Sequence, residues 1–278
     1  MTALTRIHAA ALPAPLNFLK PMAVRPVSYQ YDPPAGVPRR SGEYEPQLVS
    51  IQDARPLAAS LSLDVEGFAL LQIPTAFASF NDPAAIRSVY YPEVERLIGE
   101  ATGAVRVIAF DHNVRNAARA DSGEPGIRGP VQSTHNDFTG RSGRDRALVE
   151  LEARGLDPDL LRSRFAIVNL WRPIGRPVEK SPLALCHAGT IGPNDLIVTD
   201  LVYRDRVGET YSLQFNPAQS WFHFPRLGPD EAILIKGFDS AEHVARFTPH
   251  SAFEDPTSRP DAPERESIEV RALVFYPD

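Results

Sequence analysis

The stretch FAIVNLWRPI, Phe165 to Ile174, marks the point at which the sequence becomes rich in short β-strand patterns. Similar runs follow at intervals, and turn-forming residues separate most of them. Many short strands without alternating helices favour an antiparallel sandwich or jelly roll over a parallel α/β sheet. The runs that carry this pattern after Ile174 are LALCHA, DLIVTDLVY, TYSLQF, SWFHF, EAILIKGF and SIEVRALVFY.

Helical patterns precede this block and flank the predicted β core. One helix is expected to begin after Asp82, whose side chain suits an N-cap, with Pro83 in the first helical position. Apolar residues then recur at helical spacing until Gly103, a suitable stop. The charged segment 143–164 predicts one or two surface helices. The expected fold class is therefore mainly β with flanking helices.

Composition sets limits on domain organisation, location and partners. The chain has 278 residues, 43% of them hydrophobic, which is enough for a sizeable core. Frequent prolines predict an extended N-terminal arm over residues 1–50, followed by a single domain over 51–278. The formal charge of −6 gives no general attraction to nucleic acid or to anionic membranes. The single cysteine, Cys186, rules out an intrachain disulfide and favours the cytoplasm, and no apolar run approaches the roughly 18 residues of a membrane span.

The segment QSTHNDFT, Gln132 to Thr139, places His135 and Asp137 two residues apart. A further histidine, His250, follows the strand-rich block in TPHSAF. Two imidazoles and one carboxylate form the facial triad that holds Fe(II) and leaves positions open for a cosubstrate and oxygen. An early H-x-D pair and a late histidine are the order that a jelly-roll oxygenase requires. We therefore predict that these three residues bind a metal.

The last strand pattern supplies a site for a keto acid cosubstrate. PERESIEVRALVFY contains Arg265 and Ser267 as R-x-S, and strand period two puts Glu269 and Arg271 on the same face. A guanidinium can hold the far carboxylate of 2-oxoglutarate at two points, and a hydroxyl can add a third hydrogen bond. Arg265 and Arg271 are both candidates for this role at this point.

Other residues and other functions compete with this interpretation. His223 in SWFHF alternates with aromatic residues and is a candidate for contact with the substrate. A ligand-binding protein on the same fold would keep the triad without using it. A metal-dependent hydrolase or isomerase would need the metal but would give no reason for a dicarboxylate clamp.

Several segments together resemble a known enzyme family. They are HNDFT, IVNLWRPIGRPVEKSPLALC, WFHF with DEAILIKGFDS, TPHSAFEDP and RESIEVRALVF. The chain is similar, from Asp53 to its C-terminal end, to the family that includes a fungal gibberellin desaturase, the 7-alpha-cephem-methoxylase subunit, and hydroxylase/desaturase enzymes of fungal secondary metabolism. The resemblance implies a double-stranded β-helix, a cupin-like jelly roll, and an Fe(II)- and 2-oxoglutarate-dependent oxygenase.

The resemblance also implies roles for particular residues. It makes His135, Asp137 and His250 the iron ligands, and it implies that O2 and a small molecule are the other reactants. Asn169, Trp171 and Arg172 lie in the block most typical of the family and are expected near the substrate. The family usually has an acidic residue after LALC, where this chain has His187, so any polar contact at that position is expected to differ.

Overall fold

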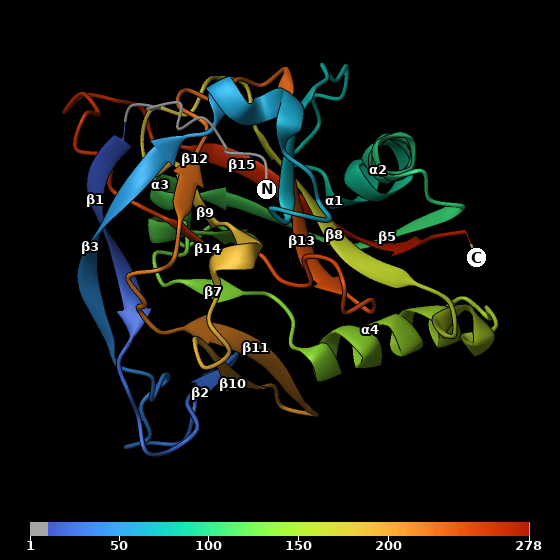
Figure 1. The fold of residues 1–278 in the computed structure, drawn as a ribbon, viewed down its shortest axis with the longest axis horizontal. Coiled ribbons are helices and arrows are strands. Elements are labelled where there is room, and N and C mark those ends of the chain that lie inside the picture. The colour runs from blue at the N-terminus through green and yellow to red at the C-terminus, as the bar shows by residue number, and fades with distance from the viewer. Residues whose placement is uncertain (1–10, 278) are drawn as a thin grey trace, which may run out of the picture.

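The computed structural model describes residues 11–277, which form two curled sheets packed face to face (Figure 1). This arrangement confirms the prediction of a mainly β jelly roll with flanking helices. The first ten residues of the predicted arm lie outside the described residues. None of the described helices is long and apolar enough to cross a membrane.

The larger sheet has nine strands and carries the two histidines of the predicted triad. In spatial order its strands are β1 (Ala11–Leu19), β3 (Tyr44–Asp53), β12 (Trp221–His223), β9 (Leu183–Cys186), β14 (His250–Ala252), β7 (His135–Asn136), β11 (Val207–Leu213), β10 (Leu196–Val202) and β2 (Val27–Tyr29).

The smaller sheet has six strands and provides the facing wall. Its order is β4 (Phe68–Gln72), β13 (Glu231–Asp239), β8 (Phe165–Pro173), β15 (Glu266–Phe275), β5 (Arg106–Asn116) and β6 (Ile127–Arg128). The final strand, β15, therefore lies inside the sheet between β8 and β5. Both neighbours run antiparallel to it.

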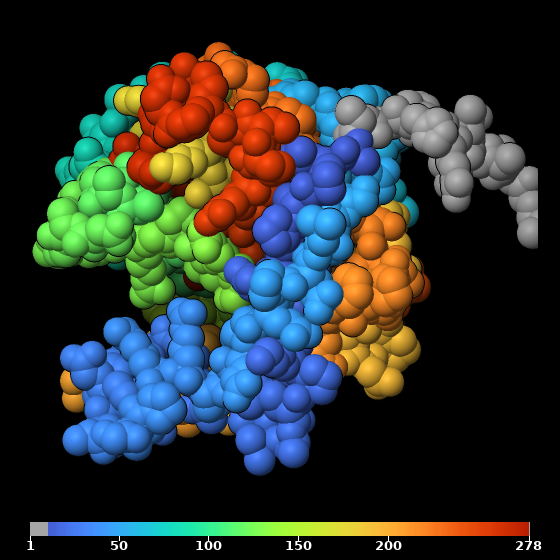
Figure 2. All heavy atoms as spheres, turned by 90° about the vertical axis from the view of Figure 1, so that its left-hand side faces the viewer, coloured from blue at the N-terminus to red at the C-terminus, as the bar shows by residue number. Residues whose placement is uncertain are grey.

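The predicted arm contributes two of the strands. β1 and β3 pair over their whole length, and β3 also pairs with β12. The other side of β1 reaches the segment before β7, where the Thr134 N–H donates to the carbonyl oxygen of Asn17 at 2.9 Å. The large sheet thus curls back on itself around a buried apolar cluster that includes Phe18 and Trp221. Figure 2 shows the N-terminal strands, in blue, crossing this side of the molecule.

The helix predicted after Asp82 is confirmed, with one irregularity. Asp82 accepts hydrogen bonds from the backbone at Ala84 and Ala85, Pro83 is the first helical residue, and Gly103 ends the helix with a φ of 67°. A π-helical turn separates the two α-helical parts. The helical elements of the chain are η1 (Arg55–Ser60), α1 (Pro83–Ala85), the π turn η2 (Ile86–Tyr90), α2 (Tyr91–Thr102), α3 (Ala117–Asp121), α4 (Gly140–Ala153), η3 (Pro158–Leu161) and η4 (Ala188–Thr190).

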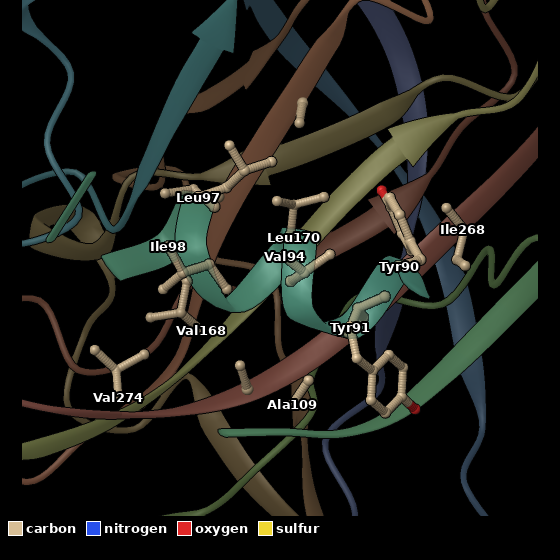
Figure 3. Packing of buried hydrophobic residues seen from close by; sticks show 14 of the residues in the cluster. Tyr90, Tyr91, Val94, Leu97, Ile98, Ala109, Val168, Leu170, Ile268 and Val274 are labelled. Atoms are coloured by element: carbon tan, nitrogen blue, oxygen red, sulfur yellow. The ribbon is translucent and has the colours of Figure 1, made fainter. Parts of the chain in front are cut away.

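Helix α2 covers the outer face of the smaller sheet. Its buried side chains, among them Val94 and Leu97, pack on even-numbered residues of β8 and β15 such as Leu170 and Val274 (Figure 3). Because side chains alternate along a strand, the odd-numbered residues of the same strands face the larger sheet. One face of β15 therefore builds this core, and the other is free to build a site.

Candidate functional site

His135, Asp137 and His250 come together where β7 and β14 pair. His250 is the direct cross-strand partner of His135, and their ring centroids are 4.7 Å apart. One ligand atom from each of the three residues can be chosen so that all lie within 4.8 Å of one another. This is the one group of three potential metal-binding side chains found in residues 11–277.

Backbone carbonyls fix the orientation of both imidazoles. Nδ1 of His135 lies 2.8 Å from the carbonyl oxygen of Ser133, and Nδ1 of His250 lies 3.0 Å from that of Thr248. A carbonyl can only accept, so each Nδ1 carries the proton and donates it. Each Nε2 is then left with a lone pair for a metal. Burial, together with the neighbouring His250, lowers the pKa of His135 to about 4, so its ring stays neutral at physiological pH.

The side chain of Asn136, which lies between His135 and Asp137, forms hydrogen bonds with backbone groups of three other residues around the site. Its side-chain amide donates to the carbonyl oxygens of Phe138 at 2.7 Å and Gly237 at 2.8 Å. Its side-chain oxygen accepts from the backbone N–H of Thr248 at 3.0 Å. The residue is fully buried. Sequence reasoning missed it, because its partners are backbone groups from distant segments.

Asp137 is held by the wall opposite the histidines. Its Oδ2 accepts from Nδ2 of Asn169 at 2.7 Å and from Nε of Arg271 at 3.1 Å. Its Oδ1 lies 3.8 Å from Nε2 of His135. Burial alone would raise the pKa of the Asp137 carboxyl, but Arg271 and smaller effects of the two histidines and Asn169 together outweigh burial and hold the pKa well below its usual range. The carboxylate is therefore ionised and available to a cation.

The inward face of β15 is polar from Ser267 to Arg271, as the R-x-S pattern predicted, and becomes apolar at Leu273 and Phe275. Its arginine opposite the triad, Arg271, binds three carboxylates: Asp137, Glu269 at 2.9 Å and Asp111 at 3.3 Å. These carboxylates raise the pKa of Arg271 although burial opposes them. Arg271 is therefore already paired within the protein.

Arg265 has a different environment. It is 3% exposed, its NH1 donates to the carbonyl oxygen of Ser181 at 2.5 Å, and its guanidinium lies over the ring of Trp171 at 5.3 Å. Its Nε has no hydrogen-bond partner in the described part of the chain, and no carboxylate of residues 11–277 forms an ion pair with it. Burial and the nearby Arg115 lower the pKa of Arg265 to about 9. The hydroxyl of Ser267 is also buried without a described partner.

A cavity joins the triad to Arg265. Its wall combines the three triad residues, two arginines and a few apolar side chains, so one cavity holds donors for a cation and guanidinium groups for an anion. Arg115, which the sequence did not single out, projects into it and makes one described side-chain hydrogen bond, to the carbonyl oxygen of Gly129 at 3.0 Å. The lining residues are Arg115, Val131, His135, Asp137, Trp171, Leu183, His250, Ala252, Arg265 and Glu269.

The remaining predicted residues separate into two groups. Asn169 and Trp171 face the site, the first on Asp137 and the second in the cavity wall. Arg172 points the other way: it is fully buried, donates to the carbonyl oxygen of Ile73 at 2.9 Å, and does not line this cavity. His223 lines a separate cavity, whose wall includes none of the three triad residues. The strand alternation that places Trp171 inward necessarily turns Arg172 outward.

Two other histidines, His187 and His112, have local roles. Nδ1 of His187 accepts from the backbone N–H of Gly189 at 3.0 Å and so caps η4. Nδ1 of His112 lies 2.8 Å from the hydroxyl of Tyr91. Neither belongs to the triad.

The donor set fits a divalent transition metal with open coordination positions. Two neutral imidazoles with free Nε2 atoms and one ionised carboxylate are the ligands that non-haem Fe(II) takes as a facial triad. Second partners fix all three ligands, as is usual for metal-binding histidines and carboxylates. Arg265, which forms no ion pair with a carboxylate of residues 11–277, lines the same cavity as the triad.

Comparisons with known proteins agree with this geometry. The family model described as oxidoreductase/YMDC permease-like domain matches residues 16–275. The chain is 33% identical over 258 residues to the Fe(II)/2-oxoglutarate-dependent dioxygenase nvfI of Aspergillus novofumigatus, covering 89% of this chain and 90% of that protein. It is 31% identical to the hydroxylase/desaturase efuI of Hormonema carpetanum, covering 85% and 86% of the two chains. The solved structure of the iron and alpha-ketoglutarate-dependent endoperoxidase NvfI superimposes with a TM-score of 0.85 at 28% identity, covering 96% and 99%.

Proposed function

The chain belongs to the oxidoreductase/YMDC permease-like domain family and is a relative of Fe(II)/2-oxoglutarate-dependent dioxygenases. From this family membership we propose which of its residues perform each part of the reaction. The protein is a dioxygenase that uses Fe(II), 2-oxoglutarate and O2 to hydroxylate or desaturate a small molecule. Its relatives include hydroxylase/desaturases, which favours C–H oxidation over the alternatives of a hydrolase or a non-catalytic binding protein.

The proposed metal ligands are Nε2 of His135, Nε2 of His250 and Oδ1 of Asp137. Bound there together with 2-oxoglutarate, Fe(II) supplies the activation of O2 that C–H oxidation needs. The protein's part is to keep the ring of His135 neutral, to hold the carboxylate ionised and to fix all three donors. The observation that carries the assignment is the set of three donors within 4.8 Å, each with its own second partner.

The proposed receptor for the far carboxylate of 2-oxoglutarate is Arg265, with Ser267 as a further donor. Arg271 was the rival, but it already pairs with three carboxylates, whereas Arg265 pairs with none among the described residues. A buried guanidinium without an anion is costly, and a carboxylate entering the cavity would relieve that cost. The ring of Trp171 holds the guanidinium in place from one face.

The substrate is proposed to be a small secondary metabolite that binds next to the triad. Leu183, Ala252 and Val131 supply apolar parts of the cavity wall, which help to exclude water from the reacting atoms. We further propose a cytoplasmic protein with neither nucleic acid nor membrane as partner. The net charge of −6 and the single, buried Cys186 support this.

The test of the function is anaerobic and needs no substrate. Purified apoprotein is given Fe(II) and then 2-oxoglutarate, and the visible absorption of the chelated keto acid is recorded. We expect this absorption in the wild type, its loss in His135→Ala, and a requirement for about 10-fold or more 2-oxoglutarate in Arg265→Gln. Iron binding without any absorption on adding the keto acid would refute the proposed cosubstrate.

A further inference from the structure

The carboxylate of the triad is held on the side away from the histidines by two residues of the opposite sheet. Nε of Arg271 reaches Oδ2 of Asp137 at 3.1 Å, its NH2 lies 3.4 Å from Oδ1, and Nδ2 of Asn169 reaches Oδ2 at 2.7 Å. Two donors thus converge on Oδ2. Only one weaker contact from the same residues goes to Oδ1, the atom nearer to His135.

Sheet register explains why these two donors act together. Arg271 on β15 and Asn169 on β8 are direct cross-strand partners, so their side chains stand next to each other on the inward face. Asp137 lies in the loop after β7 and contacts both of these side chains. On its other side Arg271 is braced by Glu269 and Asp111, which fixes the plane of the guanidinium.

The described hydrogen bond of the Asn169 side chain is the one to Asp137. The residue is fully buried, its Nδ2 donates to Asp137, and its Oδ1 has no hydrogen-bond partner within residues 11–277. A buried amide oxygen without a partner costs roughly 1–3 kcal/mol. An apolar residue would avoid that cost, so the amide is better explained by what its nitrogen does for the carboxylate than by core packing.

We propose that Arg271 and Asn169 are positioning residues for the metal. They hold Oδ2 of Asp137, so that Oδ1 points to the same spot as Nε2 of His135 and of His250. The carboxylate is thereby limited to one oxygen on the metal, which keeps coordination positions free. This inference rests on the proposed function, and it gives Arg271 a role separate from that of Arg265.

The test compares metal affinity and cosubstrate affinity in the same variants. Mn(II) is titrated anaerobically as a redox-stable probe, followed by 2-oxoglutarate on the Mn(II)-loaded protein. We expect Arg271→Gln and Asn169→Ser each to weaken Mn(II) binding by about 10- to 100-fold. Arg265→Gln is the matched control, because it also removes a buried arginine of the cavity; it should keep the Mn(II) affinity and lose affinity for 2-oxoglutarate.

Two more measurements distinguish positioning from a general loss of structure. Arg271→Lys keeps the charge but not the two-point contact, so it should recover only part of the lost affinity. The d–d absorption of bound Co(II) should change in Arg271→Gln and in Asn169→Ser, since a freed carboxylate can bind through both oxygens. Asn169→Ser decides the question if Arg271→Gln does not fold, because it deletes a neutral group only.

Each outcome has one meaning. Wild-type Mn(II) affinity and an unchanged Co(II) spectrum in folded Asn169→Ser and Arg271→Gln would overturn the positioning role. Loss of 2-oxoglutarate affinity in Arg271→Gln with intact metal binding would overturn it as well, by making Arg271 the cosubstrate receptor. If the wild type itself binds neither metal, the proposed function fails instead, and this result is distinct from the other two.

Discussion

The side-chain oxygen of Asn136 accepts a hydrogen bond from the backbone N–H of Thr248, at 3.0 Å, and so links the two chain segments that carry the triad. Asn136 lies between His135 and Asp137, and Thr248 precedes His250 by two residues. The carbonyl oxygen of Thr248 in turn orients the ring of His250. The positions of the three triad residues are therefore coupled by the protein itself, without a metal.

Replacing Asn136 by alanine should weaken both the fold and the metal site. The change removes three hydrogen bonds of a fully buried amide, and we expect the free energy of unfolding to fall by about 2–4 kcal/mol. Urea denaturation of the apoprotein measures this loss, and Mn(II) titration measures the expected weaker metal binding. Unchanged Mn(II) affinity in a destabilised Asn136→Ala protein would show that the link serves the fold alone.

Arg265 should determine which keto acids are accepted. With its guanidinium facing the cavity, the wild type should prefer 2-oxoglutarate to 2-oxobutyrate, which lacks the far carboxylate. In Arg265→Gln that preference should fall by about 10- to 100-fold, since a hydrogen-bonded charge pair contributes roughly 1.5–3 kcal/mol. Dissociation constants for the two acids on the Mn(II)-loaded protein give the ratio. An unaltered preference would assign the far carboxylate to another residue, and Arg115 would be examined next.

The pair of Arg55 and Glu231 should contribute acid-sensitive stability. Two hydrogen bonds of 2.8 Å from Arg55 lower the pKa of Glu231 to about 2, below its value near 4.3 in an unfolded chain. The unfolded state therefore binds the proton more readily, so this stability is fully present above pH 4.3 and is lost as the pH falls toward 2. Glu231→Gln should cost on the order of 2 kcal/mol at pH 7, after allowance for solvent screening, and this cost should shrink at low pH. Parallel urea titrations of both proteins between pH 7 and 3 measure the difference.

Two helical glycines should respond in opposite ways to alanine. A Cβ on Gly143 of α4 would lie 2.5 Å from a ring carbon of Phe238, so Gly143→Ala should destabilise the protein by about 1–3 kcal/mol. A Cβ on Gly99 of α2 would meet only Val107, at an ordinary 3.7 Å. Gly99→Ala should therefore stabilise the protein by up to about 1 kcal/mol, through helix propensity. Thermal unfolding of both variants checks the contrast, and equal effects would contradict the packing of α4 on β13.

Strand patterns and residue spacing in the sequence were enough to predict the β class and to select the triad. They could not choose between Arg265 and Arg271, because both lie on one face of β15 and only the neighbouring strands decide which is paired. The sequence grouped Arg172 with Trp171, although alternation separates them. His223 could not be assigned to a cavity, since β12 carries buried residues on both faces.

The N-terminal strands β1 and β3 could not be predicted from the sequence for a different reason. Pro13 and Pro15 in β1 reduce its strand propensity, yet proline is tolerated on an edge strand, where one side of the backbone needs no partner. The pairing of β3 with β12 joins segments far apart in the chain, and no local pattern reports such a contact. The role of Asn136 in the site could not be predicted for the same reason.

The central position of β15 has a consequence for how the protein is made. Synthesis runs from the N-terminus, so the strand that follows Arg265 leaves the ribosome after every other strand of its sheet. Until then β8 and β5 each lack their shared neighbour, and the donors of Arg271 and Arg265 are missing from the cavity. A nascent or prematurely terminated chain would thus lack both the Arg271 contact to Asp137 and the arginine that we propose to hold the keto acid.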